Sequence, residues 1–252
     1  MNPKKSLGQH WLDDDGVLAE IVEFAELSAE DTVLEIGPGT GTLTKKLLAS
    51  GAKVVAIEKD EALAAKLPPA DNLEIVTGDI LTHDLSQLPK GYKVVANIPY
   101  YLTSNLLRIL SESANPPAKM VLLVQKEVAE RIAAEPGQMS VLAVSIQLYY
   151  KPKLGVVVPA ELFRPPPKID SRVIILDRHP KPLFVDLDSL KFFQVIKAGF
   201  SARRKKLRSS LSGGLHLDKT TTDNLLTRAG IDGDRRAQEL SLEDWYKLSS
   251  LL

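Results

Sequence analysis

The 252-residue sequence contains no cysteine, which excludes disulfides and thiolate metal sites. It has only four histidines, and these lie far apart without the spacing of metal ligands: His10, His83, His179 and His216. We therefore expect neither a structural nor a catalytic metal.

Long apolar runs are also missing from the sequence. The chain begins MNPKKSLG, without the apolar core of a signal peptide, and no later run approaches the roughly 20 apolar residues of a membrane helix. We expect a cytoplasmic protein that has no membrane partner. With 44% hydrophobic and 25% charged residues, the chain can bury the core of one large domain, or of a domain with an appendage.

The formal net charge is zero, but the charges are unevenly distributed. Residues 180–252 hold 13 Lys and Arg against 9 Asp and Glu, a net of +4, whereas residues 1–179 carry a net of −4. A cluster of basic residues fits a polyanion partner, because such side chains replace counterions along phosphates. A solvated helix face explains a basic run equally well. The candidate RNA-binding residues are Arg203, Arg204, Lys205, Lys206 and Arg208.

Short β-rich runs alternate with amphipathic segments in the first half of the chain. Runs typical of strands cover 32–36, 53–57, 73–77, 93–96 and 120–124, and helical spacing covers 14–25, 42–49, 60–66, 103–113 and 126–134. Strands and helices that alternate at this spacing predict an α/β fold, with a parallel sheet covered on both faces.

The alternation breaks near residue 140. Residues 140–148 fit a helix or a strand, while 153–158 and 172–177 are β-rich and would close the sheet as a hairpin. Beyond residue 180 we expect helices at 190–200, 221–229 and 242–251. We therefore predict a catalytic domain at 1–179 and a small, basic, helical domain at 180–252.

A glycine-rich turn, EIGPGTG at 35–41, follows the first predicted strand, where an open parallel sheet binds its ligand. Gly37 and Gly39 have no Cβ, so a ligand can approach the backbone, and the next helix supplies N–H groups. The spacing G-x-G-x-G is not the dinucleotide motif G-x-G-x-x-G, and no G-K-[ST] follows. These differences disfavour a dinucleotide or a nucleoside triphosphate.

Two acidic residues end the next two predicted strands. Glu58 lies about 20 residues beyond Gly37, where an acid accepts hydrogen bonds from both ribose hydroxyls. Asp79 lies one strand further along and suits the exocyclic amino group of adenine. Two acids without a phosphate cradle describe an adenosine with an uncharged or zwitterionic tail, which S-adenosylmethionine fits. Taken singly, either acid also fits a solvated residue at a strand end.

An amide, a proline and an aromatic residue follow the fourth strand, in the stretch NIPYY at 97–101. The Asn97 side-chain oxygen and a backbone carbonyl near Pro99 can accept both hydrogens of an adenine amino group, while Tyr100 stacks on the base. Catalysis would rest on positioning, without a histidine base. The target adenine must lie in a single strand or leave its helix to reach this site. Phe163 is a candidate second stacking face. The alternatives are an ordinary turn with Tyr100 packed inward, and a core position for Phe163.

At these residues the chain resembles the rRNA adenine-N6 dimethyltransferase family, in its bacterial small-subunit (16S) branch. The matching stretches run along nearly the whole chain and are residues 5–12, 35–41, 58, 78–79, 97–101, 125–129, 163–171, 200–205 and 236–241. The resemblance implies a class I (Rossmann-like) methyltransferase fold with a small C-terminal helical domain. It places the cofactor contacts on His10, Leu12, Gly37, Glu58, Asp79 and Asn97. Many members have asparagine where this chain has His10, and a backbone contact there would survive that difference.

The resemblance also implies a reaction and a substrate. We expect N6,N6-dimethylation of two adjacent adenosines in a hairpin near the 3′ end of small-subunit rRNA, late in ribosome assembly. The partners would be that rRNA and the immature small subunit, and the enzyme a monomer. Two alternatives remain: a resistance-type methyltransferase of large-subunit rRNA, and an RNA-binding assembly factor of the same fold without catalysis.

Overall fold

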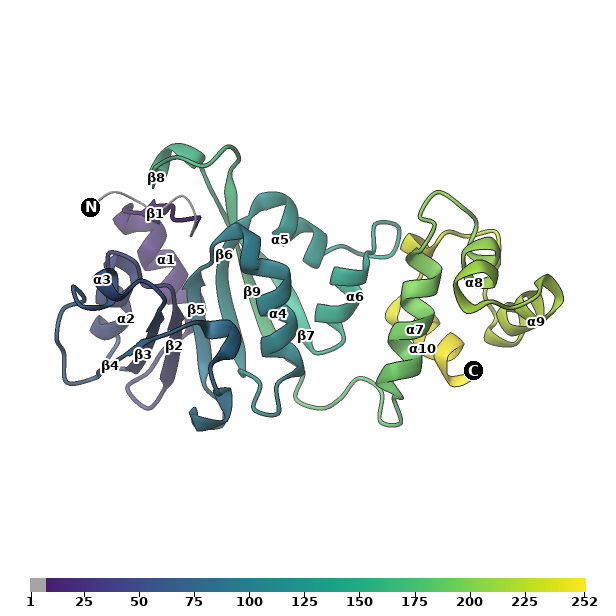
Figure 1. The fold of residues 1–252 in the computed structure, drawn as a ribbon, viewed down its shortest axis with the longest axis horizontal. Coiled ribbons are helices and arrows are strands. Elements are labelled where there is room, and N and C mark those ends of the chain that lie inside the picture. The colour runs from purple at the N-terminus through teal and green to yellow at the C-terminus, as the bar shows by residue number, and fades with distance from the viewer. Residues whose placement is uncertain (1–7) are drawn as a thin grey trace. The chain divides into compact units, whose positions relative to one another are not determined.

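The computed structural model describes residues 8–252 (Figure 1). Residues 5–7 of the matching stretch 5–12, which we call the leader, therefore lie outside the described part. None of the helices in that part is long and apolar enough to cross a membrane.

A seven-stranded sheet forms the framework of the chain (Figure 1). Its first five strands are parallel, and β9 pairs antiparallel with both β6 and β7, which confirms the predicted closing hairpin. The strands are, in spatial order, β4 (Leu73–Thr77), β3 (Lys53–Glu58), β2 (Thr32–Ile36), β5 (Lys93–Asn97), β6 (Lys119–Gln125), β9 (Ser171–Arg178) and β7 (Tyr150–Val158).

Helices cover both faces of this sheet, as the alternation of strands and helices predicts. Successive strand residues point to opposite faces, and Val33 and Val54 pack in one cluster with α1 (Asp15–Ala25) and α2 (Thr42–Ala49). Their neighbour Leu34 is also fully buried. Three further helices complete this part of the chain: α3 (Glu61–Ala64), α4 (Thr103–Glu112) and α5 (Lys126–Ile132).

The direction in which the strands are added to the sheet reverses at β2. Strand β3, which follows β2 in the chain, lies on one side of it, and β5 lies on the other. At such a switch point the connections leave in opposite directions, and a crevice opens beyond the carboxyl ends of the strands. The glycine-rich turn follows β2 at this point.

A second, two-stranded sheet attaches the leader to the rest of the chain. In it β1 (Trp11–Leu12) pairs antiparallel with β8 (Phe163–Arg164), with Leu12 opposite Phe163. Both of these side chains are buried. Without the family resemblance, the sequence would have placed the leader in a disordered tail.

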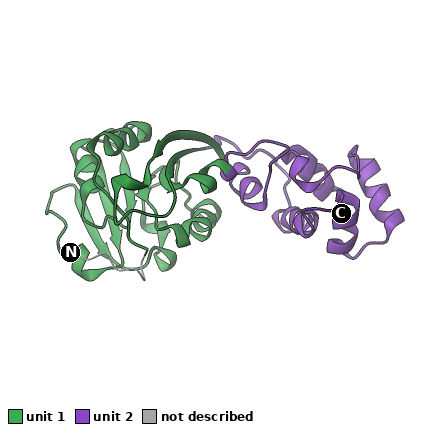
Figure 2. Ribbon diagram, turned by 90° about the horizontal axis from the view of Figure 1, so that it is seen from above, with its two compact units in different colours: residues 1–130, 150–178 green, residues 131–149, 179–252 purple. Residues whose placement is uncertain are grey.

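The chain divides into two compact units, residues 1–130 with 150–178, and residues 131–149 with 179–252 (Figure 2). The division differs from the predicted cut after His179, because α6 (Val141–Gln147) belongs to the second unit. Its buried Ala143 and Val144 share one apolar cluster with Phe192 and Trp245. The uncertain stretch at 140–148 is therefore a helix.

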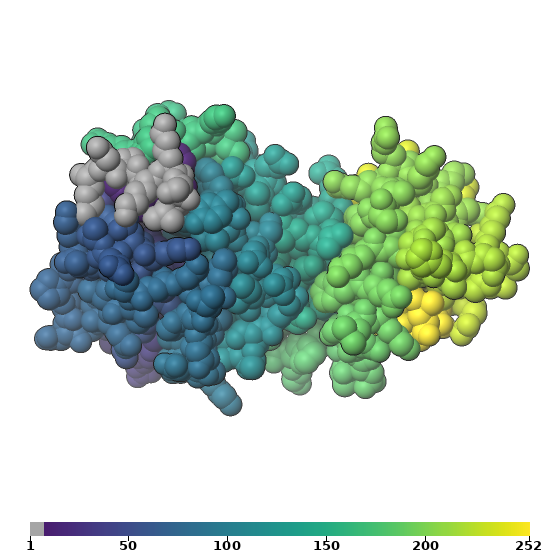
Figure 3. Space-filling view, viewed as in Figure 1, coloured from purple at the N-terminus to yellow at the C-terminus, as the bar shows by residue number. Residues whose placement is uncertain are grey.

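The second unit is helical, as predicted, and contains one helix that the sequence pattern does not reveal. Its later helices are α7 (Ser189–Phe200), α8 (Leu207–Leu215), α9 (Lys219–Ala229) and α10 (Leu242–Ser250). The unpredicted one is α8, whose sequence LRSSLSGGL is rich in weak helix formers. Gly214 explains its stability, since a Cβ there would lie 2.5 Å from the Cα of Ala198. Helices α7 and α8 therefore pack with their backbones in close contact at Ala198 and Gly214. Residues 179–252 are the green-to-yellow part of the space-filling view (Figure 3).

Candidate active site

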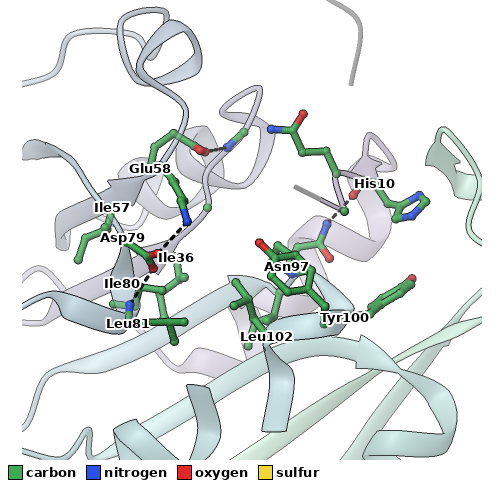
Figure 4. A pocket seen from close by; sticks show the side chains of 18 of the residues that line it. His10, Ile36, Ile57, Glu58, Asp79, Ile80, Leu81, Asn97, Tyr100 and Leu102 are labelled. Carbon is green, nitrogen blue, oxygen red and sulfur yellow. Dashed lines mark hydrogen bonds and ion pairs between the residues drawn. The ribbon is translucent and has the colours of Figure 1, made fainter. Parts of the chain in front are cut away.

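A cavity opens where β2, β3, β4 and β5 end, and its lining comes from the first unit (Figure 4). It brings together residues that lie far apart in the sequence. Eight of the predicted site residues line it: His10, Gly37, Gly39, Glu58, Asp79, Asn97, Pro99 and Tyr100.

The glycine-rich turn takes a backbone conformation that requires glycine. Gly37 and Gly39 have φ values of 66° and 58°, in the left-handed region that other residues rarely adopt. A Cβ on Gly37 would meet no atom within 4 Å, whereas one on Gly39 would lie 3.0 Å from Nε1 of Trp11. Gly37 thus leaves room for a ligand against the backbone, and Gly39 leaves room for the indole ring.

Glu58 is almost completely buried, at 5% exposure, and both of its carboxylate oxygens accept backbone hydrogen bonds. One oxygen accepts from the N–H of Gly39 at 3.0 Å (Figure 4). The other accepts from the N–H of Asp60 at 2.8 Å. The predicted ribose acceptor therefore also holds the glycine-rich turn in place. Each oxygen keeps a further lone pair for a ligand.

Asp79 lies beyond the end of β4, where it caps a short 3₁₀ turn. Its Oδ1 accepts from the N–H of Leu81 at 3.0 Å, and its Oδ2 accepts from Nζ of Lys59 at 2.8 Å (Figure 4). The hydrogen bond from Lys59, followed by that from Leu81, holds the pKa of Asp79 below its ordinary value. The carboxylate is therefore ionised at neutral pH and can accept from an amino group.

Asn97 ends β5 with its side-chain amide directed toward the leader. Its Nδ2 donates to the backbone carbonyl of His10 at 3.0 Å. Because the amide nitrogen is engaged in this way, Oδ1 is the atom left to accept from a substrate (Figure 4).

Tyr100 is held at both its hydroxyl and its ring. The hydroxyl forms a 2.8 Å hydrogen bond with Oγ of the buried Ser171, and burial raises the pKa of the phenol. The ring stacks on the imidazole of His10, with centroids 5.7 Å apart and planes 18° apart. The imidazole is itself held by a 2.7 Å hydrogen bond between Nδ1 and the carbonyl of Pro165. The Tyr100 ring is therefore held both by Ser171 and by the imidazole of His10.

The structure contradicts the prediction that Phe163 supplies a second stacking face. Its side chain is 1% exposed, packs in the apolar cluster that contains Leu12 and Ile21, and does not line the cavity. Its pairing with Leu12 across β1 and β8 directs the ring into the core. Leu12 is buried as well and is not among the residues that line the cavity, and its carbonyl accepts from Oγ1 of Thr42 at 2.9 Å.

Sequence reasoning missed the apolar walls of the cavity and one buried acid. The walls are formed by Ile36, Ile57, Ile80, Leu81 and Leu102. Ile57 and Ile80 are sequence neighbours of the predicted acids Glu58 and Asp79. This adjacency is the one sign in the sequence that they could line the same cavity.

The missed acid is Glu35, the first residue of the glycine-rich motif. It is 1% exposed, and its carboxylate oxygens have no hydrogen-bond partner of good geometry within residues 8–252. Burial raises the pKa of Glu35 to about 8, an effect opposed by the nearby Thr44 hydroxyl. Glu35 therefore keeps its proton at neutral pH.

The predicted RNA-binding run separates into two groups. Lys206 pairs with Asp234 at 2.9 Å, and Arg208 pairs with Asp234 at 3.0 Å and with Asp223 at 3.4 Å. These two basic residues are thus engaged within the second unit. The other three are exposed and have no ion pair with any residue of the described part: Arg203, Arg204 and Lys205.

The cavity fits S-adenosylmethionine on several grounds. Gly37 and Gly78 leave open space against the backbone, and apolar walls flank two acids at adjacent strand ends. Lys59 is the one basic Lys or Arg in the described lining, and it is engaged by Asp79, so nothing there resembles a polyphosphate cradle. This fold and site define the class I S-adenosylmethionine-dependent methyltransferases, and S-adenosylmethionine is the cofactor.

The chain belongs to the ribosomal RNA adenine dimethylase family, whose model matches residues 1–252. It is 41% identical to a ribosomal RNA small subunit methyltransferase A from Dehalococcoides mccartyi, over 98% of this chain and 88% of the relative. It is 40% identical to the protein of the same name from Bacillus thuringiensis, over 99% of this chain and 91% of the relative. The chain is thus an rRNA adenine methyltransferase.

Two solved structures are similar over nearly the full length. A dimethyladenosine transferase from Plasmodium falciparum has a TM-score of 0.82 and 28% identity, with 95% of this chain and 96% of that chain covered. The 23S rRNA methyltransferase ErmE has a TM-score of 0.77 and 28% identity, with 96% and 99% covered. The predicted fold class is confirmed.

Proposed function

We propose that this enzyme dimethylates N6 of two adjacent adenosines in a hairpin near the 3′ end of small-subunit rRNA, and that it acts as a monomer on the immature small subunit. The observation that carries the proposal is the full-length similarity to relatives named for the small subunit, at 40–41% identity. The lower identity to the 23S rRNA enzyme, 28%, favours this substrate over large-subunit rRNA.

The cofactor supplies a methyl group on a positively charged sulfonium, and the target N6 supplies the electron pair. That pair is delocalised into the adenine ring, so attack requires the amino group to be held toward tetrahedral geometry. Oδ1 of Asn97 accepts one N6 hydrogen, with the amide oriented by its bond to His10. We assign the second acceptor to the carbonyl of Ile98, because the Pro99 carbonyl already accepts from the N–H of Leu102 at 2.9 Å.

Stacking on Tyr100 completes the arrangement. The hydrogen bond between its hydroxyl and Ser171 holds the ring, so stacking a base requires little further ordering of this side chain. Aromatic stacking on a single base typically contributes about 1–3 kcal/mol. Because the Tyr100 ring and the Asn97 amide both line the cavity that contains Asp79, one cavity serves the target base and the cofactor.

Arg203, Arg204 and Lys205 are proposed to contact rRNA phosphates, since they are exposed and unpaired within the described residues. Phosphate contacts of this kind position a protein on RNA without reading its sequence.

The test is methyl transfer from labelled S-adenosylmethionine into three substrates: immature small subunits, free small-subunit rRNA and large-subunit rRNA. We expect label in two adjacent adenosines of the small-subunit rRNA, identified by mass spectrometry. Label in large-subunit rRNA alone would establish the alternative substrate. Binding to particles without any transfer, under conditions in which S-adenosylmethionine binds, would establish the non-catalytic assembly factor.

A further inference from the structure

The four carboxylate oxygens of Glu58 and Asp79 are not held in the same way. Three of them accept from backbone N–H groups, namely those of Gly39, Asp60 and Leu81, at 2.8–3.0 Å. Backbone donors in a turn or cap cannot leave without unfolding it. Among the hydrogen bonds that these four oxygens form within residues 8–252, only Oδ2 of Asp79 accepts from a flexible side chain, that of Lys59, at 2.8 Å (Figure 4).

The pair that Lys59 forms with Asp79 is easily broken. The Lys59 side chain is 57% exposed and that of Asp79 is 29% exposed. Exposed ion pairs contribute little net stability, because water solvates the separated charges well. Lys59 also lines the cavity, and its ammonium group lies 2.8 Å from the Asp79 oxygen that a ligand in the cavity would use.

We infer that Lys59 is a displaceable occupant of the nucleoside end of the cavity, which competes with the exocyclic amino group of the cofactor for Oδ2 of Asp79. This rests on the proposed placement of the adenine on Asp79. Lys59 neutralises the carboxylate when no nucleoside is bound and is released into solvent when one arrives. The product S-adenosylhomocysteine carries the same adenosine, so Lys59 weakens product binding as well and limits product inhibition.

The inference is tested by replacing Lys59 with methionine, which retains the length of the apolar stem and removes the charge. Dissociation constants are measured by calorimetry at low and high salt for S-adenosylmethionine, S-adenosylhomocysteine and adenosine. We expect Lys59→Met to tighten all three by about 2- to 5-fold at low salt, as the loss of an exposed ion pair allows. The gain should shrink at high salt, where the wild-type pair is already screened.

Two further variants make the result specific. Lys53→Met is the matched control, because Lys53 lies at the opposite end of β3, is also 57% exposed and forms a similar 2.9 Å pair with Glu74 outside the cavity. It should leave all three constants unchanged. In an Asp79→Asn background the effect of Lys59→Met should disappear, because the contested oxygen no longer carries charge.

Several outcomes would overturn the inference. Unchanged or weaker binding of all three ligands to Lys59→Met would do so. A gain for S-adenosylmethionine alone would identify repulsion between two cations instead of competition for Asp79. A gain that persists with Asp79→Asn would place the effect elsewhere. None of these measurements depends on RNA, so failure of the proposed rRNA substrate is recognised separately.

Discussion

The side-chain amide of Asn97 donates a hydrogen bond to the backbone carbonyl of His10, across a sequence separation of 87 residues. This bond decides which end of the amide faces the substrate, because the nitrogen is occupied and the oxygen remains available. The acceptor is the backbone carbonyl of His10, so a change of the side chain at position 10 should preserve this bond. The residue His10 therefore fixes the orientation of the Asn97 side-chain amide.

Replacing Asn97 with alanine should reduce methyl transfer at least about 10²-fold, because one of the two acceptors that shape the target amine is lost. Binding to the immature small subunit should be nearly unchanged, since phosphate contacts carry most of that affinity. Single-turnover transfer and particle binding are the two measurements. The control is Asn105→Ala, an exposed asparagine on α4 outside the cavity lining. Unchanged transfer by Asn97→Ala would refute the assigned role.

The two groups within the basic run should respond differently to charge removal. Replacing Arg203, Arg204 and Lys205 with alanine should weaken RNA binding and reduce the slope of log K against log salt by about 2–3, because up to three phosphate contacts are lost. The free energy of unfolding should not change, since these side chains have no ion pair to a described residue. Salt-dependent binding and thermal unfolding test this.

The matched variant of that experiment replaces Lys206 and Arg208, which pair with Asp234 and Asp223. We expect a small loss of stability, because these ion pairs are exposed, with a smaller change in salt slope. An unaltered slope in the first variant would assign Arg203, Arg204 and Lys205 to an ordinary solvated surface.

Glu35→Gln should change how stability depends on pH. The folded-state pKa of Glu35, about 8, lies above its ordinary value of 4.5, so the folded protein retains a proton that the unfolded chain releases. The contribution of Glu35 to the free energy of unfolding is therefore fully present at low pH. It is lost as pH rises from 4.5 toward 8, because the unfolded chain then releases the proton that the folded protein retains. A glutamine does not titrate, so the variant lacks this slope.

We expect wild type and Glu35→Gln to be similarly stable near the lower end of that range. The variant should become more stable by on the order of a few kcal/mol above about pH 8. Denaturant titrations across the pH range measure this difference. A difference that does not vary with pH would show that Glu35 titrates normally.

Two adjacent glycines of α8 provide a test of how the second unit packs. Gly214→Ala should destabilise the protein by about 1–3 kcal/mol or more, because the new Cβ would lie 2.5 Å from backbone of α7. Gly213→Ala adds a Cβ that meets nothing within 4 Å, so it should be neutral or stabilise by about 0.5–1 kcal/mol. Equal effects in thermal unfolding would contradict the close approach of the two helices.

Much of the fold and part of the site could be predicted from local pattern. The strands of the parallel sheet match their predicted ranges within one residue at each end. Short apolar, β-branched runs between segments of helical periodicity are typical of buried strands, so their positions can be predicted from the sequence. Glu58 and Asp79 were found for a related reason, since the carboxyl ends of parallel strands meet at one edge. The helix α8 was missed because its stability comes from contact with α7.

The sequence by itself determined the order of strands and helices, the glycine-rich turn and the acids beside it, since each depends on neighbours within a few residues. Only the tertiary structure decided that Phe163 is a core residue opposite Leu12, that Lys59 engages Asp79, and which basic residues are already paired. It also decided that α6 belongs to the second unit. The physical reason is common to these cases: each is a contact between residues distant in sequence, which depends on the register and packing of whole elements and leaves no trace in local periodicity.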